Sequence, residues 1–323
     1  MKFPFDIRWP LVGLLGCSAA LNVVFLINNS TQDTTESEEL VAEFEAPVEE
    51  IVEEEPVALG KDWKVLHTEV HHSLSKTFHK TGIPNGVALS AVYSRLFMWD
   101  LDMRRDLLKG DKIEVVYRLS SDGLPEVAAA RFHSKKRGKT YSAFKWQAPG
   151  DNFESYWSSD GIEAANRLKN SPLKDYEQVT SLLKDRPNHK GMDFKVPTGT
   201  KTVSPKSGVV TRVNFGNYKY NGGCVEVKFS DGVLAKWLHL DSASVKPGQK
   251  VSKGTVVGLT GNTGRSTAPH LHYQLDKGRR NIDPIDYHGT VRRSLPSTVM
   301  SDFLHHTAPY MNLLDQGNSV AGL

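Results

Sequence analysis

Two histidines on either side of one leucine, His270 and His272, are the residues of this chain best suited to chemistry. They follow a loop rich in Gly, Ser, Thr and Pro and open a short apolar run, a pattern typical of a loop that enters a β-strand. Because alternate side chains of a strand share a face, both imidazoles should project to one side, opposite Leu271 and Tyr273. Two imidazoles on one face are costly to bury without partners, and a divalent metal is one such partner. Two surface histidines on an exposed strand are the alternative.

Further side chains of the same kind come from two other places. His189 and Asp193 lie four residues apart in a segment whose glycine argues against a helix and favours a loop that leads into a strand. An imidazole nitrogen and a carboxylate oxygen are both good zinc ligands. His239 lies in an alternating apolar segment, so we expect Leu238 and Leu240 to face away from it. Taken alone, the spacing of His189 and Asp193 would be a coincidence. His239 alone would be a surface or half-buried histidine.

Together, four histidines and one aspartate exceed what one metal ion needs. A catalytic zinc takes three protein ligands and keeps one position open. Two imidazoles would then remain for acid–base work, one taking a proton from water and the other steadying an oxyanion. Zinc polarises carbonyls and lowers the pKa of water, so the set predicts hydrolysis of amides.

The segment that must position these residues, 177–290, is rich in short β-type runs separated by glycine turns, which predicts a compact antiparallel β-domain. It carries 17 Lys/Arg and 9 Asp/Glu, a balance of +8 that suits an anionic polymer as partner. The +3 net charge of the whole chain conceals this uneven distribution. The expected strands are 208–214, 224–229, 233–240, 255–259 and 271–275.

The segments before and after 177–290 predict smaller domains and single elements. We expect a small α+β domain over 61–118, a small β-rich connecting domain over 119–176, and a C-terminal helix and tail over 291–323. The expected helices are 67–80, 86–99, a short one near 161–169, and a final one from Thr298; the expected strands are 112–118, 126–132 and 139–147.

The N-terminus predicts export. Lys2 and Arg8 precede an apolar run from Trp9 to Ile27, which at about 19 residues just spans a hydrocarbon core. We therefore expect a cytoplasmic tip and transmembrane anchor over 1–29, with a lipoprotein signal at Cys17 or a cleaved signal peptide as alternatives. Residues 30–60 hold eleven acids and no Lys or Arg, which predicts a disordered acidic linker.

Residues 177–290 resemble the lysostaphin-type, or LytM, zinc metallopeptidases of family M23. The resemblance rests on His189-x3-Asp193, Trp237-x-His239-Leu and the run from Gly261 to His272. It implies one Zn²⁺ per chain with His189, Asp193 and His272 as ligands, and His239 and His270 as catalytic residues that do not bind the metal. Strand alternation alone does not tell which histidine of the 270/272 pair binds the metal.

The resemblance extends back to about residue 63, through Phe97–Asp111 and the Val-Val-Tyr strand that follows. These look like the N-terminal regulatory (LysM/OapA-like) domain of membrane-anchored murein DD-endopeptidases. That group cuts the D-alanyl-diaminopimelate crosslink of peptidoglycan, and its N-terminal domain can lie over the groove and hold the enzyme inactive.

Three features depart from the family pattern. The loop before His189 is short, which affects one wall of the groove, Trp237 stands where Tyr is common, and Gln274 stands where Glu is common. None is a ligand position, so we expect zinc binding to survive.

The sequence thus predicts a mainly β, LytM-like zinc endopeptidase preceded by a small α+β domain. It would be anchored in the inner membrane of a bacterial envelope with its bulk in the periplasm. The expected partners are peptidoglycan crosslinked peptides, the membrane and envelope regulatory proteins, with no nucleic acid. The alternatives are a non-catalytic LytM-type activator and a cell-wall binding module.

Overall fold

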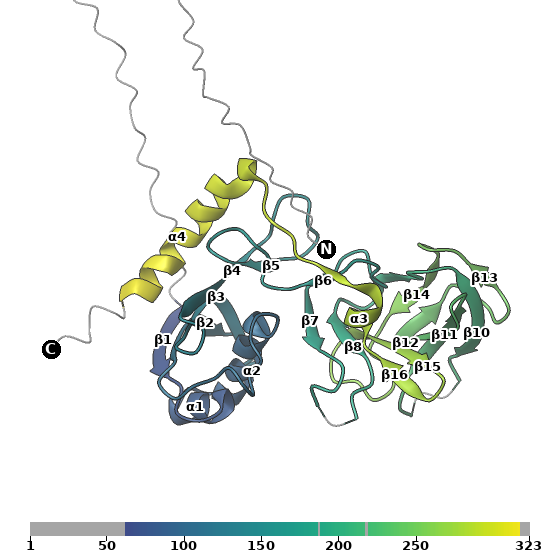
Figure 1. The fold of residues 1–323 in the computed structure, drawn as a ribbon, viewed down its shortest axis with the longest axis horizontal. Helices are drawn as coiled ribbons and strands as arrows, with labels where there is room; N and C mark the ends of the chain where they lie inside the picture. The colour runs from purple at the N-terminus through teal and green to yellow at the C-terminus, as the bar shows by residue number, and fades with distance from the viewer. Residues whose placement is uncertain (1–61, 187, 217–218, 317–323) are drawn as a thin grey trace, which may run out of the picture. The chain divides into compact units, whose positions relative to one another are not determined.

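Two antiparallel sheets organise the residues that the computed structural model describes, which are 62–186, 188–216 and 219–316 (Figure 1). We call the first the small-sheet module (residues 62–157 with the last helix, α4) and the second the large-sheet module (residues 177–290). The prediction of a mainly β catalytic segment with an antiparallel sheet is confirmed.

The small sheet has five strands in the order β1-β2-β3-β4-β5, all antiparallel. Its strands are β1 (Lys64–Glu69), β2 (Lys112–Leu119), β3 (Pro125–Ser134), β4 (Lys139–Trp146) and β5 (Ser155–Trp157). The boundary expected after residue 118 falls at the end of β2, and both sides of it contribute strands to this one sheet.

Helices cover both faces of the small sheet. On one face, α1 (Leu74–Lys80) and α2 (Gly86–Phe97) bury Phe78 and Tyr93 against strand residues such as Val115. On the other, α4 (Met300–Gln316) buries Phe303 and Leu314 in a cluster with strand residues of the same sheet. Alternation along β2 divides its residues between the two clusters.

The large sheet has ten strands, and its main path runs β13-β10-β11-β12-β15-β8-β7. In addition, β14 pairs with β12 and β9, and β16 pairs with β15. The strands are β7 (Gln178–Ser181), β8 (Met192–Lys195), β9 (Lys201–Val203), β10 (Gly208–Asn214), β11 (Gly223–Phe229), β12 (Leu234–Ala243), β13 (Lys250–Val251), β14 (Val256–Thr260), β15 (His270–Lys277) and β16 (Arg280–Ile282). Shorter elements complete the fold: β6 (Arg167–Leu168) pairs with β17 (Thr290–Val291), and α3 (Pro284–His288) and the 3₁₀ turn η1 (Ser297–Val299) follow the sheet.

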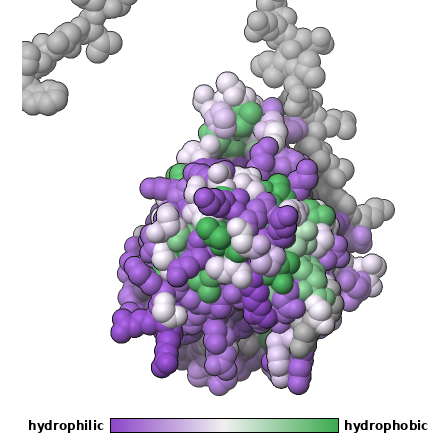
Figure 2. All heavy atoms as spheres, turned by 90° about the vertical axis from the view of Figure 1, so that its right-hand side faces the viewer, coloured by the Kyte–Doolittle hydropathy of each residue, from purple (hydrophilic) through white to green (hydrophobic). Residues whose placement is uncertain are grey.

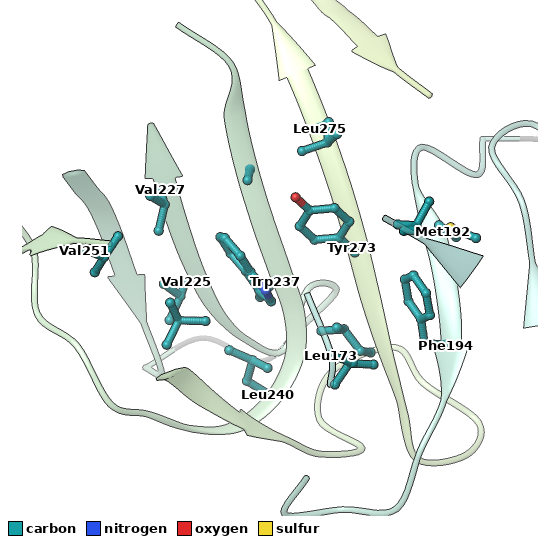
Figure 3. Packing of buried hydrophobic residues seen from close by; sticks show 14 of the residues in the cluster. Leu173, Met192, Phe194, Val225, Val227, Trp237, Leu240, Val251, Tyr273 and Leu275 are labelled. Atoms are coloured by element: carbon teal, nitrogen blue, oxygen red, sulfur yellow. The ribbon is translucent and has the colours of Figure 1, made fainter. Parts of the chain in front are cut away.

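The core of the large-sheet module fixes the direction of its functional side chains. Trp237 of β12 lies directly opposite Tyr273 of β15, with ring centroids 5.4 Å apart, and both are fully buried (Figure 3). Leu271 and Leu275 join them on the same face of β15. Because side chains alternate along a strand, His270 and His272 take the opposite face, as predicted.

Two expected helices differ from the structure. The helix expected over 67–80 begins only at Leu74, because residues 64–69 form β1 at the edge of the small sheet. The short helix expected near 161–169 is absent there, since its place is taken by β6 and by bridges from Ile162 to Ser294 and from Glu163 to Trp157. The helix expected from Thr298 is confirmed as α4.

The predicted anchor (1–29) and acidic linker (30–60) lie outside the described residues. Within the described ranges, no helix combines the length and apolar character needed to cross a membrane. Figure 2, which looks onto the right-hand end of Figure 1, shows hydrophilic side chains over most of that face with small apolar groups between them. Such scattered apolar groups are ordinary on a surface that faces water.

Candidate active site

Three candidate metal-binding side chains converge on one face of the large sheet. Asp193 of β8 and His272 of β15 lie directly opposite each other in register, so their side chains share a face. His272 Nδ1 is 2.7 Å from Asp193 Oδ1, and His189 Nε2 is 3.1 Å from Asp193 Oδ2. One ligand atom from each of the three residues lies within 4.8 Å of the other two, and all three residues are buried.

The loop before β8 sets the tautomer of His189. Its Nδ1 donates a hydrogen bond to the carbonyl oxygen of Leu182 at 2.6 Å, which leaves Nε2 for a partner on the side of Asp193. Although Asp193 lies close, Nε2 is buried without a hydrogen bond. A buried nitrogen without a hydrogen bond, beside a carboxylate and a second imidazole, fits a metal ion. These residues therefore match the donor set of a catalytic zinc site.

Gly191 allows the three ligands to approach one another. A Cβ at this position would lie 2.3 Å from the carbonyl oxygen of Tyr273 and 2.9 Å from Nε2 of His272. Any larger residue would push β8 away from β15, and with it Asp193 away from His272. The glycine between His189 and Asp193 is thus part of the site as well as a helix breaker.

The charges of the cluster reinforce one another. Burial alone would lower the pKa of His189, but the nearby carboxylates of Asp185 and Asp193 outweigh it and raise the pKa to about 9. Burial alone would raise the pKa of Asp193, and the imidazoles of His189 and His272 beside it instead hold it far below its usual range. An ionised carboxylate between two imidazoles is the electrostatic setting that a divalent cation would share.

His239 reaches the site by a β-bulge, which the sequence pattern did not predict. Its φ is +63°, and the register of β12 shifts here, so that alternation breaks between Leu238 and Leu240. Leu240 faces the core, but Leu238 lies directly opposite His272 and shares the face of the site. The expectation that both leucines face away from His239 is therefore wrong for Leu238. A left-handed conformation at a residue with a side chain is sparsely populated and is often found at functional sites.

The second pair of imidazoles is also oriented by backbone carbonyls. His239 Nδ1 donates to the carbonyl oxygen of Thr263 at 2.8 Å, and His270 Nδ1 donates to that of Ala268 at 2.8 Å. The two rings lie 4.7 Å apart between centroids, and His270 Nε2 is 3.9 Å from Asp193 Oδ1. Burial lowers the pKa of His239 to about 4, so this ring is neutral at pH 7.

All five residues singled out in the sequence thus meet in one place. Sequence reasoning missed the groups that orient them, because backbone carbonyls leave no signature in side-chain spacing. It also missed Arg186, whose NH2 lies 2.7 Å from Asp193 Oδ2. Gln274 shares the strand face of the site, but its amide donates to both oxygens of Asp276 at 2.9 Å and points along the strand.

Comparison with known proteins agrees with this geometry. Residues 187–284 match peptidase family M23. The chain is 31% identical over 255 residues to the peptidoglycan DD-endopeptidase ShyA of Vibrio cholerae, which covers 75% of this chain and 57% of that protein. It is 29% identical over 259 residues to ShyC, a peptidoglycan DD-endopeptidase of the same organism, with 75% and 58% covered.

A solved structure of Helicobacter pylori Csd3 shares 23% identity at a TM-score of 0.40, covering 79% of this chain and 70% of that one. The chain spans a little more than half the length of the two Vibrio relatives. Its residues 187–284 are a peptidase family M23 domain.

Proposed function

We propose that this protein is a zinc-dependent peptidoglycan endopeptidase that hydrolyses peptide crosslinks, the D-alanyl-diaminopimelate bond in particular. The observation that carries the proposal is the convergence of three ligand atoms within 4.8 Å, with two further imidazoles 4.7 Å apart beside them. The two Vibrio relatives named as DD-endopeptidases support the choice of substrate.

In this proposal His189, Asp193 and His272 hold one Zn²⁺. The ion would supply a Lewis acid that polarises the scissile carbonyl and lowers the pKa of water. The protein supplies the rigidity of the site: His189 is fixed by the Leu182 carbonyl, and Asp193 and His272 are fixed by the register of β8 and β15. Such preorganisation keeps the ligand geometry from being rebuilt at each turnover.

His239 and His270 carry the proton transfers. Each has its Nδ1 proton committed to a backbone carbonyl, so each offers Nε2 to the substrate. A neutral Nε2 can take the proton of the attacking water, and a protonated one can donate a hydrogen bond to the oxyanion that develops. Because burial keeps His239 neutral at pH 7, it suits the role of proton acceptor.

A non-catalytic activator or a cell-wall binding scaffold is the alternative function. Either would tolerate the loss of ligands, whereas here all five positions are filled and oriented. The site therefore favours an enzyme.

The place of action follows from the substrate. We propose that the chain acts in the periplasm of a bacterial envelope, held at the inner membrane by its N-terminal apolar segment. Envelope regulatory proteins would be its partners. Fractionation of cells that express the full chain, followed by detection with an antibody, would test this: recovery in a soluble cytoplasmic fraction would contradict it.

We also propose that the small-sheet module restrains the enzyme. Deleting the module must take account of α4, whose apolar face is buried on the small sheet. The comparison should therefore use residues 62–323 and 177–290, with circular dichroism to establish that the shorter chain is folded. A folded fragment that is no faster than the longer chain would remove the idea of restraint.

The central test combines metal analysis with product analysis. The purified protein should hold about one zinc per chain and release uncrosslinked peptides from defined crosslinked muropeptides, as read by mass spectrometry. His272→Ala should lose both zinc and activity. Retained activity in that variant would contradict the site, and zinc without any product would favour the scaffold.

A further inference from the structure

The loops beside the site carry an excess of positive charge. Loop 182–190 and loop 261–268 flank the histidines, and loop 219–222 accepts the backbone N–H of His239 through Asn221. Across these loops the chain has five cations against one acid, Asp185. The five are Lys184, Arg186, Lys190, Lys219 and Arg265. This excess would attract a negatively charged substrate as a whole, without selecting one of its carboxylates.

Among these cations, Arg186 is the one whose ion pair reaches a candidate zinc ligand. Its Nη2 donates to Asp193 Oδ2 at 2.7 Å, while 58% of its side chain remains exposed. A guanidinium has five N–H donors in a planar fork, so one bond to Asp193 leaves several for a second carboxylate. Arg186 therefore lies at the rim of the site, with one N–H group bound to Asp193 and others available to a ligand.

The loop holds this residue in place. Asp185 accepts the backbone N–H of Leu182 at 3.0 Å, and the carbonyl oxygen of Arg186 accepts the N–H of His189 at 3.2 Å. Lys184 and Asn188, on either side, adopt left-handed conformations with φ of +62° and +64°. A loop closed by its own hydrogen bonds loses little conformational freedom when it binds a ligand.

The crosslink in the proposed function offers a matching group; this step rests on that proposal. In diaminopimelate each amine shares its carbon with a carboxylate. The scissile nitrogen is one of these amines, so a carboxylate lies within about 4 Å of it by bond lengths alone. Substrate bound with its scissile carbonyl at the cluster would bring this carboxylate to the rim where Arg186 stands.

We propose that Arg186 binds the carboxylate on the carbon next to the scissile nitrogen, and so selects crosslinks in which that group is free. Arg186 would also keep its hydrogen bond to Asp193, which would hold the planar guanidinium toward the substrate. Replacement of the carboxylate by a primary amide would remove the charge and place an NH₂ donor against a cation that only donates.

The test uses the zinc-loaded full chain and a matched pair of crosslinked muropeptides that differ only in that carboxylate or its amide. The wild type should hydrolyse the carboxylate form with a kcat/KM roughly 10- to 100-fold higher, the range expected of a charge-assisted hydrogen bond. Arg186→Ala should lose most of this preference, chiefly through KM. Arg186→Lys should restore part of it, because it keeps the charge without the fork.

Lys190→Ala is the matched control, since it removes an exposed cation from the same loop and should keep the preference. Zinc content and resistance to a chelator are measured for every variant. If Arg186→Ala loses zinc while its preference among loaded molecules is intact, Arg186 serves only Asp193 and the inference is wrong. Equal rates of the wild type on both substrates also contradict it, and hydrolysis of neither contradicts the proposed endopeptidase instead.

Discussion

Both sheets carry a row of titratable side chains across neighbouring antiparallel strands, and only one of the rows forms a candidate metal site. In the small sheet, Glu114 of β2 is 2% exposed and lies between His67 of β1 and Arg131 and His133 of β3. His133 Nε2 is 3.1 Å from Glu114 Oε1, and Arg131 NH1 is 3.6 Å from Glu114 Oε2.

The large sheet arranges similar residues differently. Asp193 has imidazoles at both oxygens, and its arginine approaches from an exposed loop rather than from the strand beside it. In the small sheet the arginine belongs to the row itself and faces the acid, while Asp315 of α4 pairs with that arginine. Among the described residues, only the large-sheet group brings three ligand atoms within 4.8 Å. Both acids thus pair with an arginine, and Asp193 differs in having an imidazole nitrogen within 3.1 Å of each of its oxygens.

The largest expected effect comes from replacing the carboxylate of Asp193, in the large sheet, with an amide. Asp193→Asn should reduce zinc well below one per chain and lower kcat/KM more than about 1,000-fold, because a neutral amide oxygen is a much weaker zinc ligand. Metal analysis and muropeptide assays measure both. A variant that keeps its zinc would show that the two rows differ less than their geometry suggests.

The next effect separates the ligands from the second pair of imidazoles. His239→Ala and His270→Ala should each lower kcat by about 100- to 10,000-fold while zinc stays near one per chain, because they remove a proton-transfer group and no ligand. His72→Ala, at an exposed position of the small-sheet module, is the control. Loss of zinc in either variant would move that histidine into the ligand set.

The third effect concerns stability, and it should arise on the core side of the large sheet. His288 is 5% exposed, its Nε2 lies 3.0 Å from the hydroxyl of Tyr273, and burial lowers its pKa to about 4. Nearby Lys206 and Lys253 lower this pKa further, and Asp231 opposes them.

Below its unfolded pKa of about 6.5, the unfolded chain binds a proton that folded His288 does not. Its contribution is therefore complete above pH 6.5 and lost as the pH falls toward 4, on the order of 3 kcal/mol in all. Urea unfolding at pH 7 and pH 5 should show a smaller pH-dependent loss for His288→Gln than for wild type. His72→Gln should match the wild type, and an unchanged slope in His288→Gln would contradict the assignment.

The smallest expected effect comes from the change in the small sheet that corresponds to Asp193→Asn. Glu114→Gln should lower the free energy of unfolding by roughly 1–3 kcal/mol, because Arg131 loses a buried charged partner. Zinc content and kcat/KM should stay at wild-type values. A loss of zinc in this variant would mean that the small-sheet row binds metal after all.

The sequence predicted the candidate site residues better than it predicted the strand register and the contacts that position them. Strand alternation around Leu271 and Tyr273 was enough to place His270 and His272 on one face, because a strand with an apolar core on one side leaves little freedom of register. The bulge at His239 was not predictable from its apolar neighbours, since a register shift depends on the partner strands. The approach of His133 to Glu114 depends in the same way on the register of two strands, which local spacing does not show. The helix expected near 161–169 failed for the same reason, because tertiary pairing outweighs local propensity.

The packing of α4 has a consequence for how the chain matures. Trp63 and Tyr310, 247 positions apart, meet edge to face with ring centroids 5.9 Å apart, and Phe303 shares a cluster with Phe144 and Trp157. In topological terms the large-sheet module is an insertion within the small-sheet module, whose last helix is synthesised after it. During synthesis, the apolar face of the small sheet therefore stays uncovered until α4 has been made. A chain that stops before residue 300 would expose this face to proteases and to aggregation, even though every residue of the candidate metal site had been made.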